Sequence, residues 1–329
     1  MILAGDVGGT KVNLALYKHE GQNLIPAGVQ SYPSQQFTSL QAVLDALKRD
    51  RPETIDAAAF GIAGPVVNDR CKVTNLQWDI DAAELRAQLG VPVGLLNDME
   101  ATAYGMLQLR PEERVVLQKG VVQERAAIGV IAAGTGLGEC ALVWDGYRYR
   151  AMPSEGGHAD FAPRNLIESD LLAFLLKRHD HVSCERLLSG SGVHVLYEFL
   201  LERSRKAAPV WLKEEMAKED PAAVVSRAAM AGKDPTCREA LDLFVRIYGA
   251  EAGNIALKFL ARGGVYVGGG IAPKILASMT SGAFVDAFNA KGRFVDFMKQ
   301  IPVVVITNDR IALVGAAHYA KILLTQSTK

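Results

Sequence analysis

The chain has 329 residues, and its 36 basic and 36 acidic side chains give a formal net charge of zero. This balance excludes the strongly basic composition of a nucleic-acid-binding protein, so we expect no nucleic-acid partner. Because one hydrophobic core rarely grows beyond about 250–300 residues, we expect two domains. Glycine is enriched, with 31 residues, and this excess is compatible with loops, hinges or phosphate-binding turns.

Neither a leader sequence nor a membrane span is expected. Asp6 comes too early for the apolar core of a signal peptide, and the longest apolar stretch, 126–144, contains Glu139 and four glycines. The four cysteines form no Cys-x-x-Cys pair and no cluster with histidine. This spacing predicts reduced thiols, a cytoplasmic location and no structural zinc site.

Strand and helix patterns alternate along the first 110 residues. We expect strands at 2–5 and 12–17, joined through Gly8 and Gly9 as a β-hairpin. The elements that follow are a helix, two strands and a second helix, expected in that order at 40–47, 55–61, 91–96 and 99–108. This alternation predicts an α/β architecture.

The composition changes after a polar break at 110–114, which predicts a crossover. The segment 204–234 is rich in Lys, Glu and Ala, and we expect solvated helices there. The remaining expected elements are strands at 127–133, 140–144, 265–267 and 303–307 and helices at 166–178, 193–203, 236–260 and 311–324.

Two glycine turns in the chain resemble each other. DVGGTKVNLALY, from Asp6, and AAGTGLGECALVW, from Ala132, both have the order strand, glycine turn with a threonine, strand. The turns begin 126 residues apart, at Gly8 and Gly134. The match predicts two related halves, or it is a coincidence, since glycine hairpins are common.

Glycine turns can bind phosphate, because backbone N–H groups without a neighbouring side chain can approach an anion closely. Neither turn is a Walker A loop or a GxGxxG that opens a helix, so a purely structural turn is an alternative. Asp6 favours the phosphate interpretation, because an acidic residue at a strand end can hold Mg²⁺ directly or through water.

A third glycine run, Gly268, Gly269 and Gly270, follows the strand at 265–267. Pro273 suits the first turn of a helix, whose N-terminus would attract an anion. The three glycines also leave room for a flat ring such as adenine.

Asp98 has two interpretations. It follows a predicted strand and precedes a predicted helix, so it is an N-cap, a carboxylate that accepts a hydroxyl proton, or both, since a capped helix start keeps a catalytic side chain rigid. In the loop between Pro153 and Pro163, Glu155 and His158 flank two glycines and can hydrogen-bond sugar hydroxyls. Glu185, by its spacing alone, is a surface residue at the start of a helix.

Six ordered motifs resemble those of the bacterial glucokinases, in the branch distinct from the ROK sugar kinases. They span some 270 positions and are GDVGGT at 5–10, LLNDMEATAYG at 95–105, AAGTGLG at 132–138, SEGGHADFAP at 154–163, ERLLSGSG at 185–192 and GGGIAPK at 268–274. The cysteine-rich zinc motif of the ROK proteins is absent. Lys11 departs from the family pattern, which has a small polar residue there, and we leave it outside the site.

The resemblance implies a two-domain α/β protein of the actin-like ATPase (ribonuclease H-like) fold, with a cleft between the domains. It implies a small domain of residues 1–110 plus 303–329, to which the C-terminal helix returns, and a large domain of residues 111–302. It also implies a cytoplasmic homodimer without membrane or nucleic-acid partners.

The resemblance further implies an ATP- and Mg²⁺-dependent transferase that phosphorylates the 6-hydroxyl of glucose at the start of glycolysis. Its glucose contacts are Asn97, Asp98, Glu155, His158 and Glu185, with Asp98 as the catalytic base. The residues that it assigns to ATP are Gly5, Asp6, Val7, Gly8, Gly9, Thr10, Gly134, Thr135, Gly136, Gly268, Gly269 and Gly270, with Mg²⁺ near Asp6.

Three alternatives remain at this stage. The first is a kinase for another hexose, such as mannose or fructose. The second is an actin-like, sugar-sensing ATPase that hydrolyses ATP without phosphorylating sugar. The third is a ROK-like transcriptional regulator, which is disfavoured because a strand expected to begin at Ile2 leaves no room for an N-terminal DNA-binding helix pair.

Overall fold

The structure is a computed structural model that describes residues 1–21, 23–73 and 76–327. The chain forms two compact units. The first unit comprises Met1–Glu113, Ala151–Pro153 and Asn308–Lys329, and the second comprises Arg114–Arg150 and Ser154–Thr307.

The last strand belongs to the second unit. This strand, β13 (Val303–Ile306), pairs in parallel with β12 (Gly264–Gly268) and antiparallel with β8 (Arg114–Gln118). Its four residues are all buried in that sheet. The boundary expected at residue 303 is therefore corrected, because the chain returns to the first unit only at Asn308.

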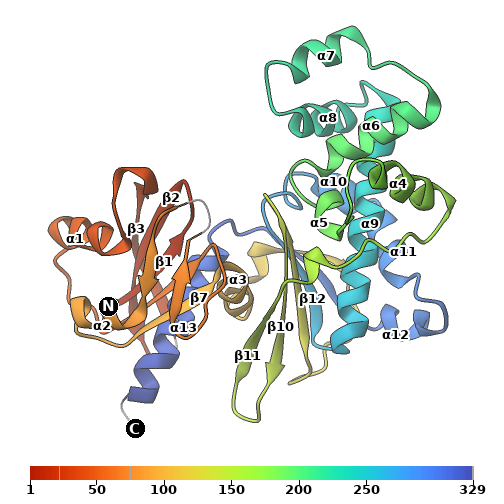
Figure 1. The fold of residues 1–329 in the computed structure, drawn as a ribbon. Helices are drawn as coiled ribbons and strands as arrows, with labels where there is room; N and C mark the ends of the chain where they lie inside the picture. The colour runs from red at the N-terminus through yellow and green to blue at the C-terminus, as the bar shows by residue number, and fades with distance from the viewer. Residues whose placement is uncertain (22, 74–75, 328–329) are drawn as a thin grey trace. The chain divides into compact units, whose positions relative to one another are not determined.

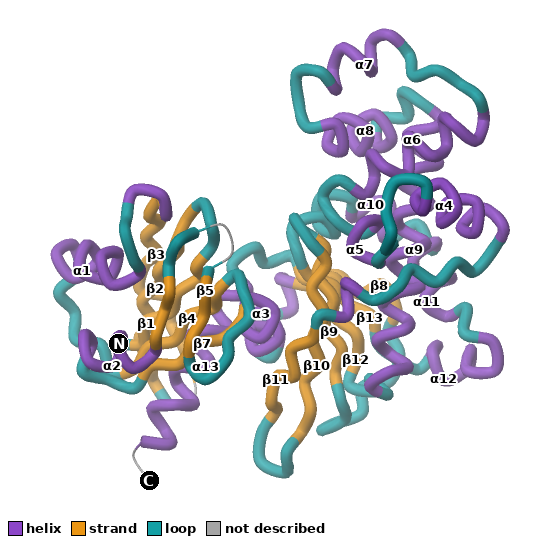
Figure 2. Tube along the Cα trace, viewed as in Figure 1, coloured by secondary structure: helices purple, strands orange, loops and turns teal. Residues whose placement is uncertain are grey.

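The sheet of the first unit has five strands in the order β3-β2-β1-β4-β7 (Figures 1 and 2). The strands are β1 (Ile2–Val7), β2 (Lys11–Glu20), β3 (Asn23–Pro33), β4 (Ala57–Ile62) and β7 (Val93–Asn97). β1 and β2 are antiparallel, which confirms the predicted hairpin, and β1, β4 and β7 run parallel. A separate two-stranded hairpin joins β5 (Arg70–Lys72) to β6 (Asp79–Asp81).

Helices cover both faces of this sheet. Leu40, Val43 and Leu47 of α1 (Leu40–Asp50) pack in one core with Leu3 and other sheet residues. On the opposite face, Ala316 and Ala320 of the C-terminal helix pack against Ala4 and Ala15. The helices of this unit are α1 (Leu40–Asp50), α2 (Ala82–Leu89), α3 (Asp98–Met106) and α13 (Ile311–Ser327), with short 3₁₀ turns at Ser34–Gln36 and Pro111–Glu113.

The sheet of the second unit repeats this topology. Its strand order is β11-β10-β9-β12-β13-β8. The strands of this sheet not yet described are β9 (Ile128–Ala133), β10 (Leu137–Trp144) and β11 (Tyr149–Ser154). β9 and β10 form an antiparallel hairpin, and β9, β12 and β13 run parallel, as β1, β4 and β7 do. The resemblance between the two glycine turns therefore extends to the strand order of the two sheets and to the direction of the hairpin and the two parallel strands beside it, which favours two related halves over coincidence; β8 has no counterpart in the first sheet.

The helical part of the second unit is built around α9 (Pro235–Phe259). Its N-cap is Asp234, whose carboxylate accepts a hydrogen bond from the Cys237 backbone, and Pro235 occupies the first turn. The other helices are α4 (Leu166–Leu176), α5 (Cys184–Leu187), α6 (Gly192–Ser204), α7 (Val210–Met216), α8 (Pro221–Met230), α10 (Leu276–Met279), α11 (Ala283–Asn289) and α12 (Val295–Lys299), with 3₁₀ turns η3 (Gly156–His158) and η4 (Gly292–Phe294).

The segment 204–234 contains α7 and α8, beside α6 in Figure 1. Its expected solvation is wrong for α8, because Val224, Val225 and Ala229 are fully buried in the core of the second unit. The apolar positions of α8 recur at helical spacing, and this signal is stronger than the charge of the segment as a whole.

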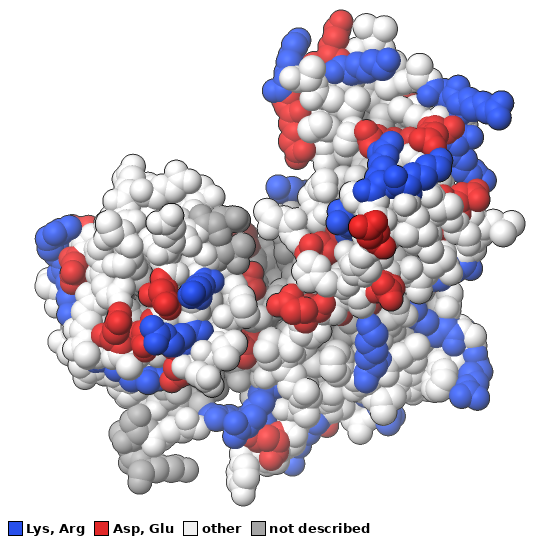
Figure 3. All heavy atoms as spheres, viewed as in Figure 1, with Lys and Arg blue, Asp and Glu red and all other residues white. Residues whose placement is uncertain are grey.

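All four cysteines are buried and form no disulfide. No helix among the described residues is long and apolar enough to cross a membrane. On the face drawn in Figure 3, basic and acidic side chains are interspersed.

Two glycines allow α3 and α13 to approach closely. A Cβ at Gly315 would overlap the Ala101 carbonyl oxygen, and one at Gly105 would overlap that of Ile311. We therefore expect Gly315→Ala to separate the helices and to destabilise the first unit by about 1–3 kcal/mol, the usual cost of overpacking. Thermal denaturation without ligands measures this effect.

Gly270→Ala is the matched control, because its new methyl group would meet nothing within 4 Å. Equal melting temperatures for Gly315→Ala and this control would contradict the packing explanation.

Candidate active site

The candidate residues of the first unit lie at one edge of its sheet. In the parallel strands β1, β4 and β7, Val7 is level with Ile62, and Ile62 is level with Asn97. The turn after β1 and the start of α3 therefore both follow the carboxyl ends of parallel strands. This is the edge at which open α/β sheets bind their ligands.

The first glycine turn is fixed by a serine outside it. Gly8 N donates to the Lys11 carbonyl oxygen at 3.0 Å, which closes the turn. Ser34 donates from its hydroxyl to the Gly8 carbonyl oxygen and from its backbone N–H to the Thr10 carbonyl oxygen. Ser34 is fully buried, and nothing local in the sequence indicated this role. Thr10 is exposed at the tip of the turn.

Gly5 has a packing function. A Cβ at this position would overlap the ring of Phe60 on the neighbouring strand. The structure thus explains Gly5 by the close approach of Phe60, whereas Gly8 and Gly9 form the turn itself. Val7 is buried at the end of β1, and its carbonyl oxygen accepts a hydrogen bond from Ala63 N.

Asp6 is a partly buried carboxylate beside this turn. Its Oδ2 accepts a weak hydrogen bond from Asn13 Nδ2 at 3.3 Å, and within the described chain Oδ1 accepts none. Burial raises the pKa of Asp6, while Asn13 and the charge of Lys11 act in the opposite direction. A buried carboxylate with an oxygen left over is a suitable ligand for a hard cation such as Mg²⁺.

Asn97 and Asp98 have different structural roles. The Asn97 side chain accepts from Glu100 N at 2.6 Å, and the Glu100 carboxylate accepts from Asn97 N at 2.9 Å, so the two form a capping box. Asp98 is the first residue of α3 and is exposed. The interpretation of Asp98 as the N-cap is therefore wrong, because Asn97 is the cap.

In the second unit, a carboxylate binds the second glycine turn. Gly134 N donates to the Gly136 carbonyl oxygen at 2.8 Å, and Leu137 N donates to Oε2 of Glu185 at 2.9 Å. A Cβ at Gly136 would come within 2.5 Å of the same Oε2. Glu185 lies in α5, so it does begin a short helix, but its side chain points to this turn. Thr135 is exposed at the tip.

Glu185 also belongs to a cluster with His158 and Glu155. His158 Nδ1 lies 3.8 Å from Oε1 of Glu185, and Nε2 lies 4.0 Å from Oε2 of Glu155. The side chains of Glu185, His158 and Glu155 are 31%, 59% and 77% exposed. An imidazole between two accessible carboxylates offers donors and acceptors to neighbouring hydroxyls of one small polyol.

The third glycine run lies directly beside the second turn. Gly268 is level with Ala132 in the sheet, and Ile271 N donates to the Ala133 carbonyl oxygen at 3.3 Å. Gly269 has φ +81°, and a Cβ there would overlap that carbonyl oxygen, whereas Gly270 faces open space. The run is thus part of the same surface as the turn at 134–136.

A buried tyrosine, not identified from the sequence, links these two segments. Ala133 N donates to the hydroxyl of Tyr248 at 3.1 Å, and that hydroxyl donates to the Gly268 carbonyl oxygen at 3.4 Å. The helix expected around Pro273 is wrong, because residues 269–275 form successive turns and the four-residue α10 begins only at Leu276. The glycine run at 268–270 therefore does not lie at the N-terminus of a long helix, where the helix dipole would attract an anion.

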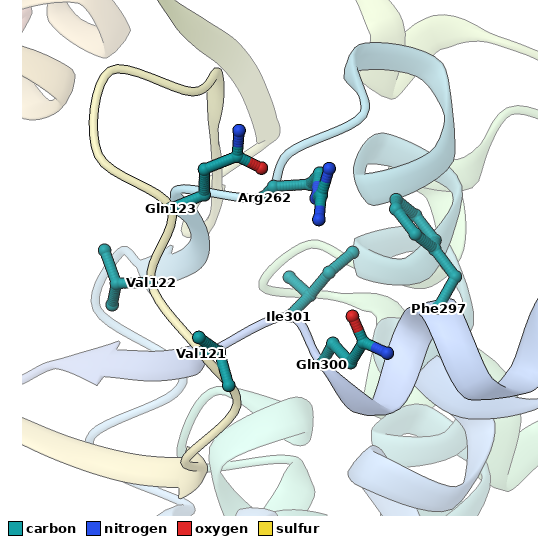
Figure 4. A pocket seen from close by; sticks show the side chains of 7 residues that line it. All are labelled: Val121, Val122, Gln123, Arg262, Phe297, Gln300 and Ile301. Atoms are coloured by element: carbon teal, nitrogen blue, oxygen red, sulfur yellow. The ribbon is translucent and has the colours of Figure 1, made fainter.

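One cavity of about 320 Å³ lies elsewhere in the second unit (Figure 4). Its lining comes from the 121–123 loop, Arg262 and the 297–301 segment at the end of α12. No residue of the candidate site lines it.

Two sheets of one topology, each opened by a glycine hairpin, define the class of protein: the chain has the actin-like ATPase fold. A crystal structure of a glucokinase from an Antarctic psychrotroph aligns with a TM-score of 0.88 and 31% identity, covering 98% of both chains. A Streptomyces griseus ROK-family glucokinase, solved with glucose and AMPPNP, aligns over 98% of this chain and 99% of its own with a TM-score of 0.62 at 20% identity, which shows the fold alone.

Sequence comparison identifies the family. The Glucokinase family model matches residues 3–323. A glucokinase from Nostoc sp. is 42% identical over 96% of this chain and 98% of its own length. The chain therefore belongs to the Glucokinase family.

The capping box makes a local prediction. Asn97→Ala removes the acceptor of Glu100 N and costs about 1 kcal/mol, so we expect hydrogen exchange at this amide to become about fivefold faster. Asp98→Asn leaves the box intact and serves as the control. Equal exchange rates at Glu100 in the two variants would show that Asn97 does not stabilise the helix.

Proposed function

We propose that this chain transfers the γ-phosphoryl group of ATP to the 6-hydroxyl of glucose, giving glucose 6-phosphate and ADP in the first step of glycolysis. The observation that carries the proposal is the Glu155, His158 and Glu185 cluster, which adjoins the turn at 134–136 through the Leu137–Glu185 hydrogen bond. A sugar-binding group and a glycine turn suited to phosphate thus share one side chain. Membership of the Glucokinase family gives independent support.

Glucose would bind through charge-assisted hydrogen bonds. The carboxylates of Glu155 and Glu185 accept from sugar hydroxyls, and the imidazole of His158 donates to or accepts from a third. Asn97 contributes its Nδ2 group, because its Oδ1 is already bound to Glu100 N. The proposal requires these residues to act on the same glucose molecule as Asp98.

Asp98 is the proposed general base. It accepts the proton of the 6-hydroxyl as that oxygen attacks the γ-phosphorus of ATP, and the bond from the γ-phosphorus to the bridging oxygen of ADP breaks. Its place at the first residue of α3, with Asn97 capping the helix before it, holds the carboxylate on a rigid element.

Backbone N–H groups of the two glycine turns would bind the phosphates of ATP, with Thr10 and Thr135 adding hydroxyl groups. Gly268, Gly269 and Gly270 would accept the adenosine, since Gly270 leaves open space beside the backbone. Asp6 would hold Mg²⁺ directly or through water. The ion, when bound, neutralises charge that develops on the phosphates.

The direct test is ADP release with ATP and Mg²⁺ against glucose, mannose, fructose and a sugar-free control. We expect glucose to give the highest kcat/KM. Faster turnover with mannose or fructose would identify another hexose as the substrate. ADP release that does not depend on sugar would contradict a kinase and indicate an ATPase.

We also propose a cytoplasmic homodimer, which the family resemblance supports. Light scattering of the purified protein tests the dimer, and cell fractionation tests the location. A monomer at micromolar concentration would contradict the first of these proposals.

Asp98→Asn tests the base. We expect kcat to fall by about 10²–10⁴-fold, while KM for glucose changes little, because the amide keeps the shape but cannot take the proton. Asp50→Asn, at an exposed aspartate that ends α1, is the control. Normal turnover of Asp98→Asn would remove this residue from the mechanism.

Gly136→Ala tests the connection between the turn and the sugar cluster. The new methyl group would displace the flexible end of Glu185, so we expect KM for glucose to rise about tenfold, as for loss of one charge-assisted hydrogen bond. At Gly134 a methyl group would meet nothing within 4 Å, so Gly134→Ala leaves Glu185 in place. The same KM for glucose in both variants would contradict the connection.

A further inference from the structure

A buried carboxyl group lies beneath the turn that carries the sugar-binding residues. Glu139 is the third residue of β10, and only 2% of it is exposed. Its Oε1 is buried and, among the described residues, has no hydrogen-bond partner. Glutamate is rarely buried without a partner, because the loss of hydration of the charged form is costly.

The Glu139 side chain supports Gly156 from below. A Cβ at Gly156 would overlap Oε2 of Glu139, so the backbone of η3 rests directly on the carboxyl group. The neighbouring Ser154 hydroxyl accepts a hydrogen bond from Gly156 N at 2.8 Å. Glu155 precedes this glycine and His158 follows it by two residues, so a shift of the Gly156 backbone would move both side chains.

The charged group with the largest effect on Glu139 is Glu251 on α9. The Glu251 carboxylate has partners for both of its oxygens. Its Oε2 accepts from Asn254 Nδ2 at 2.8 Å and from Cys184 Sγ at 3.4 Å. Its Oε1 lies 3.4 Å from Lys258 Nζ. Both oxygens of Glu251 therefore have partners, whereas Oε1 of Glu139 has none among the described residues.

Other groups around Glu139 do not supply a positive charge at its oxygens. Tyr248 of α9 and Cys184 of α5 face it, and burial raises the pKa of each of these groups. Burial, followed by the charge of Glu251, raises the pKa of Glu139 from its ordinary 4.5 to about 7, and Lys258 opposes this shift. The folded protein thus holds a neutral carboxylic acid under Gly156 below neutral pH.

We propose that Glu139 is a positioning residue for the sugar site: its neutral carboxyl group supports the turn that carries Glu155 and His158, and loss of its proton shifts this turn and weakens glucose binding. Ionisation places a negative charge near Glu251, on a carboxyl group whose Oε1 has no hydrogen-bond partner among the described residues. The carboxylate then moves toward water or draws water in, and Gly156 moves with it. This inference rests on the proposed function.

The first test is KM for glucose against pH. In the wild type, we expect KM to rise above about pH 7, by up to about tenfold per pH unit. Glu139→Gln keeps the shape and is neutral at every pH, so it should abolish this rise. Glu168→Gln, at a buried carboxylate paired with Arg164, should keep the wild-type profile. A rise in KM that persists in Glu139→Gln would overturn the proposal.

Two charge variants separate a titration from simple structural damage. Glu251→Gln removes a negative charge and should move the midpoint of the KM profile to lower pH, because Glu251 raises the pKa of Glu139. Lys258→Gln removes a positive charge and should move it to higher pH. Midpoints that move in the same direction would contradict the titration of Glu139.

A final measurement does not depend on catalysis. The folded protein keeps a proton on Glu139 that the unfolded chain releases above about pH 4.5, so the wild type should lose stability relative to Glu139→Gln from about pH 4.5 to 7. A constant difference in melting temperature between the wild type and Glu139→Gln over this range would contradict the proposal that Glu139 is neutral in the folded protein. Failure to phosphorylate glucose would instead contradict the proposed function, and the melting comparison would still stand.

Discussion

The candidate site of the second unit depends on the Glu185 carboxylate. One of its oxygens accepts the Leu137 N–H at the start of β10, and the other lies beside His158. The helix α5 that carries it has only four residues, so the hydrogen bond fixes the side chain more than the helix does. Gly136 lacks a side chain where that carboxylate stands. A single carboxylate thus contacts both the second glycine turn and the histidine of the proposed sugar-binding cluster.

Beneath the 154–158 turn, the second unit buries two carboxyl groups, which is unfavourable for stability. Glu139 and Glu251 are buried in one region of an otherwise apolar core, and Glu139 has no partner for Oε1. An apolar residue of the same size at position 139 would cost less, since burial of a polar group without a hydrogen-bond partner is unfavourable. In the first unit, Asp6 is partly buried beside its turn, with one oxygen not hydrogen-bonded within the described chain. Such groups are concentrated at functional sites, where a perturbed carboxyl has a use.

Local patterns in the sequence predicted much of the fold. The glycine turns, the alternation of strand and helix and the repeat at 126 residues all follow from short-range chemistry, and the sheets bear them out. The strand at 303–306 was assigned to the wrong unit, because its pairing partners β12 and β8 are set by tertiary structure. Ser34 and Tyr248 were missed for the same reason, since each contacts a turn distant in the chain. Asn97 was predicted as a sugar contact, and its role as the cap of α3 was not predicted.

The most direct test of the role of Glu185 is a double-mutant cycle with Gly136, measured as the dissociation constant of glucose by calorimetry. If the methyl group of Gly136→Ala acts by displacing Glu185, it should have almost no effect in the Glu185→Ala background. The account predicts a coupling energy of about 1 kcal/mol or more between the two substitutions. Effects that add to within about 0.5 kcal/mol would contradict it, because the two residues would then act independently.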